Sequence, residues 1–181
     1  ALSVAEGLGR LRAALSKPGQ VLRVVGLSGT GKTRMVQAIF EKEVGNGEPP
    51  DQAFVLYTDL GNEPEPSARE MLLRLGLKEQ RAIVIVDNCN PKAHQTLADV
   101  VSQYKKHLSL LTVEYDVADD DSPDATDVYE LAPASAQVLE GILQRLVPHL
   151  TGPDRHRITE FAGGNARVAL ALARTVNKGE T

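Results

Sequence analysis

The sequence predicts an α/β fold, in which a five-stranded, mostly parallel sheet forms a three-layer sandwich with helices and is followed by a helical lobe. Five short apolar runs, rich in β-branched or aromatic residues, predict the strands, and helix-period segments lie between most of them. Strands that alternate with helices are typical of a parallel sheet covered on both faces. After Pro133 the strand signals stop and helical periodicity takes over. We therefore expect a lead-in helix within residues 1–17, a sheet lobe over 18–133 and a helical lid lobe over 134–181.

Each expected element has the length typical of its kind. The strands are expected at 21–26 (VLRVVG), 53–59 (AFVLYTD), 82–87 (AIVIVD), 108–116 (LSLLTVEYD) and 127–133 (DVYELAP). The helices are expected at 4–15, 32–44, 67–75, 91–106 and 135–150, and in the segments after Gly152 and Pro153 and after GGN at 163–165. Glycine, proline and Asn165 supply the stop and N-cap signals that separate the last helices.

The composition is that of a globular protein and argues against some partners. Of the 181 residues, 42% are hydrophobic and 24% are charged, and the net charge of −4 provides no overall basic field for a nucleic-acid backbone. We therefore expect no direct nucleic-acid binding, with a local basic patch left open. Without a secretory signal or an apolar run of membrane-spanning length, we expect a cytoplasmic location and no membrane partner. Because the chain begins at Ala1 rather than at methionine, we expect it to be part of a longer protein.

The segment GLSGTGKT at 26–33 fits the phosphate-loop pattern G-x-x-x-x-G-K-[ST], between a predicted strand and a predicted helix. Its glycines permit positive φ angles, so that successive N–H groups can point into a concavity that holds phosphate. Lys32 would reach the β- and γ-phosphates, and the Thr33 hydroxyl would bind Mg²⁺. The alternative is a glycine-rich turn without a ligand. We expect the loop to bind ATP or ADP with Mg²⁺, and the sequence does not distinguish ATP from GTP. The residues expected to contact the nucleotide are Gly26, Ser28, Gly29, Thr30, Gly31, Lys32, Thr33 and Arg34.

The run AIVIVDNCN at 82–90 fits the Walker B description of a buried strand that ends in an acid. Asp87 would hold the water shell of Mg²⁺ across from Thr33, which makes both residues metal ligands and Asp87 a catalytic residue together with Lys32. The alternative is a core strand whose final aspartate caps the following helix. The next residue, Asn88, can orient a water molecule but cannot accept its proton, so hydrolysis should be slow.

A catalytic carboxylate must then come from another strand, and Glu114 is the candidate. In the expected strand order, the 108–116 strand lies between the phosphate-loop strand and the Asp87 strand, so its carboxyl end should face the γ-phosphate. Alternation places Thr112, Glu114 and Asp116 on one side of the sheet, so Asp116 competes for the role. The alternative for Glu114 is a surface acid at a strand end.

The segment GGNAR places Arg167 in the first turn of the last helix, where a cation opposes the helix dipole. A γ-phosphate brought in by closure of the helical lobe would be a partner that explains this position. A solvated arginine is the alternative, and the position alone favours it.

Together, these motifs resemble the ATPase module of the AAA+ class of P-loop NTPases, and more closely its STAND branch of signal-transduction ATPases with numerous domains. LAPASAQVLEGIL at 131–143 is similar to the leucine-proline-serine stretch that opens the lid helices there, and GGNARVALALA at 163–173 resembles the glycine-x-proline segment. In two departures, Ala166 stands where the family has proline and Glu114 stands near the position of an arginine sensor. Arg167 follows Ala166 as the sensor-2 arginine does in AAA+ proteins, so the resemblance implies that Arg167 binds the nucleotide.

The segments TVEYD and TDVYELAPAS are also similar to the antiviral STAND proteins of bacteria, large sensors that bind phage proteins and oligomerise to switch on an N-terminal effector. This resemblance implies a switch in which ATP, bound by the sheet lobe and Arg167, sets the angle between the lobes and assembles an oligomer surface. The expected partners are further copies of the protein and a protein trigger. Slow hydrolysis would make the active state long-lived.

Two other functions stay open. A small-molecule P-loop kinase would use the same phosphate loop and transfer the phosphoryl group to an acceptor hydroxyl, which Asp59 could hold. A DNA-loading AAA+ protein of the initiator type shares the GNAR-like sensor, but the acidic balance argues against direct DNA contact by this chain.

Cys89 is expected to be a packed side chain, and the four histidines show no metal-ligand spacing. The candidate arginine fingers, which the sequence does not rank, include Arg69, Arg74, Arg81 and Arg155.

Overall fold

The computed structural model describes residues 2–114 and 126–177 and divides the chain into two compact units. The first unit consists of Ala1–Val25 with Lys32–Glu130, and the second consists of Gly26–Gly31 with Leu131–Thr181. Asp116, which competes with Glu114 as a predicted base, lies outside the described residues.

The first unit contains a five-stranded sheet in the order β2-β3-β4-β1-β5. Its strands are β1 Val21–Val25, β2 Val55–Asp59, β3 Ala82–Asp87, β4 Leu108–Val113 and β5 Asp127–Glu130. All the described strand pairs are parallel, and β4 lies between β1 and β3. The predicted α/β class and the predicted place of β4 are therefore confirmed.

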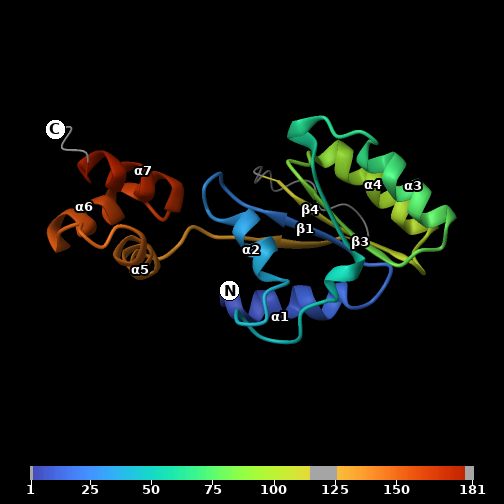
Figure 1. The fold of residues 1–181 in the computed structure, drawn as a ribbon, viewed down its shortest axis with the longest axis horizontal. Coiled ribbons are helices and arrows are strands. Elements are labelled where there is room, and N and C mark those ends of the chain that lie inside the picture. The colour runs from blue at the N-terminus through green and yellow to red at the C-terminus, as the bar shows by residue number, and fades with distance from the viewer. Residues whose placement is uncertain (1, 115–125, 178–181) are drawn as a thin grey trace. The chain divides into compact units, whose positions relative to one another are not determined.

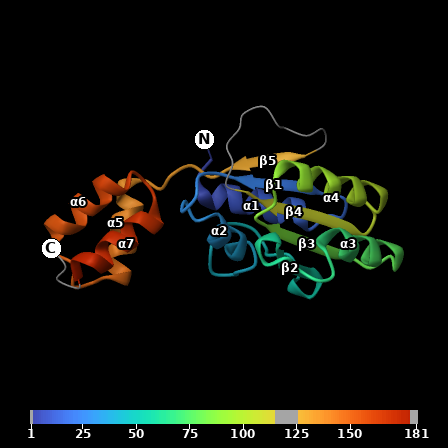
Figure 2. The same ribbon diagram turned by 90° about the horizontal axis from the view of Figure 1, so that it is seen from above.

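Helices cover both faces of this sheet (Figures 1 and 2). They are α1 Val4–Leu15, α2 Lys32–Ala38, α3 Ala68–Leu77 and α4 Pro91–Gln103, with short 3₁₀ helices η1 Gln52–Phe54 and η2 Leu60–Asn62 on either side of β2. The helices α1 and α2 pack on one face, called the α1–α2 face below, and α3 and α4 pack on the other, the α3–α4 face.

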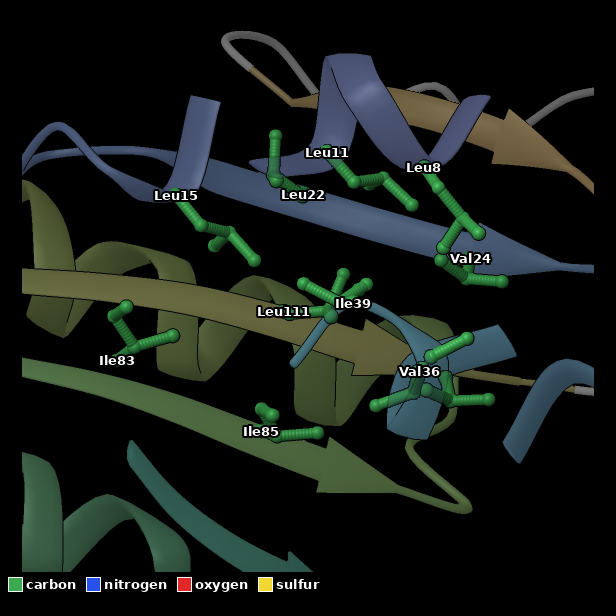
Figure 3. Close-up of a cluster of buried hydrophobic side chains, with 12 residues drawn as sticks. Leu8, Leu11, Leu15, Leu22, Val24, Val36, Ile39, Ile83, Ile85 and Leu111 are labelled. Carbon is green, nitrogen blue, oxygen red and sulfur yellow. The ribbon is translucent and has the colours of Figure 1, made fainter. Parts of the chain in front are cut away.

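The two buried faces of the sheet explain the near-continuous apolar sequences of β3 and β4, which are buried along their whole length. Successive strand residues point to opposite faces. In β3, Ile83 and Ile85 therefore lie on the α1–α2 face, and Val84 and Val86 lie on the α3–α4 face. Figure 3 shows the core of the α1–α2 face, with Leu8, Leu11, Leu15, Leu22, Val24, Val36, Ile39, Ile83, Ile85 and Leu111. The core of the α3–α4 face includes Leu72, Val84, Val86, Cys89, Leu97, Val101, Leu108 and Leu110.

The helix α2 ends at Ala38, although the sequence predicts a helix to residue 44. The guanidinium of Arg12, which is 1% exposed, donates hydrogen bonds of 2.6–3.0 Å to six backbone carbonyl groups in this part of the chain. These carbonyl groups belong to Ala38, Ile39, Glu41, Val44, Asn46 and Gly47. The helix is shorter than predicted because Arg12, rather than a further helical turn, satisfies these groups.

The described part of the second unit contains α5 Ala136–Leu146, α6 Gly152–Ala162 and α7 Ala166–Asn177. Side-chain oxygens of Ser135, Thr151 and Asn165 accept N–H groups of the first turns and so cap the three helices. Gly163 ends α6 with a φ of 54°, a left-handed conformation that glycine adopts without strain. The predicted stop and N-cap signals between these helices are confirmed. The unit has its own core, made of Leu139, Leu143, Val147, Leu150, Ile158, Ala162, Ala169 and Ala173.

None of the helices in the described ranges is both long and apolar enough to cross a membrane.

Candidate nucleotide-binding site

The phosphate loop joins β1 to α2 and has the backbone conformations that its glycines permit. Gly26, Gly29 and Gly31 have φ angles of 148°, 83° and 101°, which L side chains rarely adopt. Within the loop, the N–H and the hydroxyl of Thr30 both donate to the carbonyl of Leu27, over 3.4 and 2.8 Å. Such a glycine-rich turn lets successive peptide groups line a concavity that suits an anion. The loop therefore fits a phosphate group.

Asn165, the N-cap residue of α7, also contacts the phosphate loop within the second unit. Its Oδ1 accepts the N–H groups of Arg167 and Val168, while its Nδ2 donates to the carbonyl of Ser28 over 2.8 Å. A β-carbon on Gly29 would overlap the Asn165 side chain, so glycine is required there for space as well as for conformation. The sequence predicted the cap but not the second contact, because nothing local to Asn165 indicates which segment its amide meets.

Thr33 and Asp87, the two residues predicted to hold Mg²⁺, are brought together in the first unit. The Thr33 hydroxyl donates to Asp87 Oδ2 over 3.0 Å, and the backbone N–H of Asn88 donates to Asp87 Oδ1 over 2.9 Å. Asp87 ends β3 and is only 8% exposed. A hydroxyl and a carboxylate are the oxygen ligands that a hard cation such as Mg²⁺ prefers, so this pair fits the metal. Metal binding itself stays a prediction.

Tyr57 is a third member of this group, which the sequence analysis missed. Its hydroxyl donates to Asp87 Oδ2 over 3.0 Å, so two hydroxyl groups meet on one carboxylate oxygen. Burial and then the hydrogen bond to Asp87 raise the pKa of Tyr57 to about 12, so the phenol keeps its proton at neutral pH. In the sequence, Tyr57 is only an aromatic residue in an expected strand, and the parallel register of β2 with β3 is needed to place it beside Asp87.

Asn88 turns its side chain toward β2. Its φ angle is 53°, and its Nδ2 donates to Asp59 Oδ1 over 2.6 Å. Asp59 Oδ1 also accepts the N–H of Gly61 and caps η2. The N-cap of α4 is Asn90, whose Oδ1 accepts the N–H of Ala93 over 2.8 Å. The alternative prediction, that Asp87 is the cap of this helix, is therefore wrong.

Glu114 is buried rather than exposed, so the alternative prediction of a surface acid is wrong. It follows β4 directly, its N–H donates to the carbonyl of Val24, and its carboxylate forms an ion pair with Arg23. The two side chains are each only 5% exposed. Arg23 alternates along β1 with Leu22 and Val24, whose side chains lie on the α1–α2 face, so the ion pair lies on the α3–α4 face. The role of Glu114 as a base stays a prediction, and the structure adds that this carboxylate already binds Arg23.

His94 extends this buried polar group, and the sequence analysis did not identify it. Its ring nitrogens Nδ1 and Nε2 lie 2.7 Å from Thr112 Oγ1 and 3.1 Å from Thr126 Oγ1. Burial, together with the positive charge of Arg23, lowers the pKa of His94 to about 4, so the imidazole is neutral at pH 7. Because His94 belongs to α4, this contact places Thr112 on the α3–α4 face with Glu114, as strand alternation predicts.

The remaining predicted residues have varied surroundings. Arg34 forms a bidentate ion pair with Glu41, over 2.7 and 2.8 Å, and this hydrogen bonding raises the pKa of the exposed guanidinium. Arg167 is exposed in the first turn of α7. Cys89 is buried, and burial followed by the charge of Glu114 raises the pKa of its thiol to about 12, in keeping with a packed side chain.

Three of the candidate arginine fingers have structural contacts, and among them Arg155 donates to the carbonyl of Leu150 over 3.3 Å. Arg74 pairs with Glu70 one turn earlier in α3, and Arg81 donates to the carbonyl groups of Leu15, Ala82 and His107. Arg81 therefore contributes to packing at the amino ends of β3 and β4, whereas Asp87 and Asp59 lie at the carboxyl ends of β3 and β2.

The fold is similar to solved structures, although no family model matches the sequence and no curated protein gives a significant sequence match. Drosophila ORC bound to DNA is 16% identical, with a TM-score of 0.62 over 97% of this chain and 55% of that chain. A STAND protein with a tetratricopeptide repeat sensor from Pyrococcus horikoshii is 11% identical, with a TM-score of 0.56 over 92% of this chain and 28% of that chain. C. elegans PCH-2 is 13% identical, with a TM-score of 0.51 over 98% of this chain and 61% of that chain.

At these identities the likeness concerns the fold alone. The chain spans less than two thirds of each of the three structures, so their whole-protein activities do not transfer to it. The strand order β2-β3-β4-β1-β5 and the helical unit that follows agree with this likeness. The chain therefore has the α/β fold of AAA+ P-loop ATPases, as the sequence predicts.

Proposed function

We propose that the chain is the ATP-binding, slowly hydrolysing switch module of a larger signalling or defence protein of the STAND type. The single observation that supports it most is the hydrogen bond from Thr33 to Asp87, directly after a phosphate loop whose three glycines have positive φ. Along the chain, a loop that suits phosphate leads directly into Lys32 and Thr33, and the Thr33 hydroxyl and the Asp87 carboxylate form a pair of oxygen ligands that suits Mg²⁺.

In this proposal, the loop residues 26–33 bind the phosphates of ATP through backbone N–H groups, and Lys32 neutralises charge on the β- and γ-phosphates. The Thr33 hydroxyl would hold Mg²⁺, and the Asp87 carboxylate would hold its water shell. The metal supplies charge neutralisation for the phosphates. Arg34, held by Glu41, lies next in α2 and adds positive charge near the loop.

Slow hydrolysis follows from the surroundings of Asn88 and Glu114. The amide of Asn88 cannot accept a proton, and it already donates to Asp59. Glu114, our proposed base, has its carboxylate bound to Arg23 on the α3–α4 face, whereas Asp87 lies on the α1–α2 face. Glu114 would have to break or share its ion pair with Arg23 before its carboxylate could accept a proton from water. The ATP state should therefore persist, which suits a switch better than a motor.

Arg167 is the residue that we propose to report the γ-phosphate from the second unit. Contact with ATP would favour one arrangement of the two units, and loss of the γ-phosphate would release it. Such a change could expose a self-association surface in the full-length protein, triggered by a bound protein as in the antiviral STAND proteins that the sequence resembles. The similarity to the Pyrococcus STAND protein supports this assignment.

An initiator-type, DNA-loading ATPase is the second candidate, favoured by the likeness to Drosophila ORC bound to DNA over 97% of this chain. The net charge of −4 argues against it. Fluorescence anisotropy with labelled duplex DNA at low salt separates the two candidates. Affinity that falls steeply with salt would support the initiator function, and absence of binding with ATP present would support the switch.

A kinase is the remaining alternative, and Asp59 was its predicted acceptor-binding residue. In the structure, Asp59 Oδ1 already accepts hydrogen bonds from the Gly61 N–H and from the side-chain amide of Asn88. The test is ADP production with Mg²⁺ and ATP, alone and with a panel of small hydroxylated acceptors. The switch predicts turnover below about 1 s⁻¹, the low end for enzymes, with or without acceptors. Strong stimulation by one acceptor would overturn it in favour of the kinase.

A further inference from the structure

The hydrogen bond between Tyr57 and Asp87 has no counterpart among the predicted site residues. Tyr57 lies in β2, an edge strand of the sheet, two residues before Asp59, which pairs in register with Asp87. Tyr57 is 54% exposed, whereas Asp87 is 8% exposed. The exposed ring gains little hydrophobic stabilisation from burial. What distinguishes the position of Tyr57 is therefore the hydrogen bond of its hydroxyl to the buried Asp87 carboxylate.

The accepting capacity of Asp87 shows what this hydroxyl does. A carboxylate has about four lone-pair directions. Three are occupied here: Oδ1 accepts the N–H of Asn88, and Oδ2 accepts the hydroxyls of Thr33 and Tyr57. About one direction is left for a further partner, such as a water molecule bound to a cation. Donors from α2, from β2 and from the residue after β3 also leave the carboxylate little freedom to rotate.

Thr33 and Tyr57 differ in what they can do for a cation. A hydroxyl that donates its proton to Asp87 still has lone pairs, so Thr33 can bind a metal ion while it keeps this hydrogen bond. Tyr57 belongs to β2, whereas Thr33 belongs to α2, and the Tyr57 hydroxyl donates to the same oxygen. The phenol has a single O–H donor, which here is directed to Asp87 Oδ2.

We propose that Tyr57 is a positioning residue of the magnesium site, which holds the Asp87 carboxylate in the orientation that binds the metal-bound water. This inference rests on the proposed function, since it concerns the same nucleotide site. It adds a residue to that site and assigns its effect to the metal rather than to the nucleotide. Mutation of a residue that orients a metal ligand by a hydrogen bond typically lowers metal affinity or activity by about ten- to a hundredfold.

The variant Tyr57→Phe removes only the hydroxyl, and Tyr104→Phe is the matched control. Tyr104 lies at the end of α4, packed against the core of the α3–α4 face. Calorimetric titration of ATP at a series of Mg²⁺ concentrations and in EDTA separates metal-dependent from metal-independent binding. We expect Tyr57→Phe to need about tenfold more Mg²⁺ for half-maximal tightening, with unchanged affinity in EDTA and an unchanged melting temperature. Tyr104→Phe should have the Mg²⁺ dependence of the unmodified protein.

A double-mutant cycle then tests whether Tyr57 acts through Asp87. In the Asp87→Asn background, Tyr57→Phe should cause no further change in Mg²⁺ dependence. Equal Mg²⁺ dependence of Tyr57→Phe and the unmodified protein would overturn the inference and leave the proposed function intact. So would an additive effect in the Asp87→Asn background. If the unmodified protein bound no ATP with Mg²⁺, the proposed function and the inference would both be wrong.

Discussion

Asp87 ends β3 and Glu114 directly follows the neighbouring strand β4, yet their side chains lie on opposite faces of the sheet. Asp87 continues the series of Ile83 and Ile85 on the α1–α2 face and accepts the Thr33 hydroxyl. Glu114 follows Val113, which belongs to that same face, and therefore lies on the α3–α4 face with Arg23. The predicted metal ligand and the predicted base are thus separated by the sheet itself.

The first prediction concerns Glu114 and its partner Arg23. Glu114→Gln should preserve ATP affinity and lower the rate of hydrolysis by about a hundredfold, because a side-chain base contributes about that factor or more. The measurement is ADP release in a single turnover. Arg23→Gln is the matched control, since it breaks the same ion pair but keeps the carboxylate. If both variants lose the same fraction of activity, Glu114 acts only through the buried pair and not on water.

The second prediction concerns the buried Arg12. Arg12→Met should lower the free energy of unfolding by about 3–5 kcal/mol, because several buried carbonyl groups lose their charged donor. Urea denaturation measures this loss. Arg10→Met, on the exposed side of the same helix, should change stability by less than about 0.5 kcal/mol. Similar losses in the two variants would show that the carbonyl contacts of Arg12 do not stabilise the fold.

The third prediction concerns His94 and acid. Its pKa is lowered to about 4 in the folded protein, against an ordinary value of about 6.5, so the unfolded state binds the proton first as the pH falls. The folded protein should therefore be fully stabilised above about pH 6.5 and lose about 3 kcal/mol as the pH falls to about 4. Arg23 is the charged group that acts on His94, and the two ring contacts are to Thr112 and Thr126.

The measurement for His94 is the pH dependence of urea denaturation between pH 7 and pH 4.5. His94→Gln should show a shallower loss of stability over this range, whatever its stability at pH 7. The exposed His149 supplies the control, because His149→Gln should keep the slope of the unmodified protein. An unchanged slope in His94→Gln would contradict the assignment of acid sensitivity to this residue.

Local signals in the sequence predicted much of the fold. The helix α1 has its predicted bounds because Ser3 and Glu6 form a capping box, in which each residue satisfies a donor of the other. The strands β1 and β3 were placed by short apolar runs next to glycine or aspartate. Contacts between distant segments were not predictable. The early end of α2 depends on Arg12, which lies more than twenty residues away in the sequence.

The same division applies to the candidate site. The phosphate loop is a continuous motif, and Thr33 and Asp87 were recognised from their local patterns. Alternation correctly placed Thr112 and Glu114 on one face, but the sequence could not say that Arg23 and His94 fill that face. Tyr57 was missed for a related reason. Its hydroxyl reaches Asp87 only because β2 pairs in parallel with β3, and strand pairing is a property of the tertiary fold.

Nucleotide binding is tested most directly by calorimetric titration of ATP into the unmodified protein and into Lys32→Ala, each with Mg²⁺ and with EDTA. We expect that the unmodified protein binds ATP, that Mg²⁺ tightens binding, and that Lys32→Ala lowers the affinity at least about tenfold, a loss of about 1.4 kcal/mol. Equal binding by both proteins, or no binding of ATP by the unmodified protein, would contradict the central claim that residues 26–33 and Asp87 form a magnesium–nucleotide site.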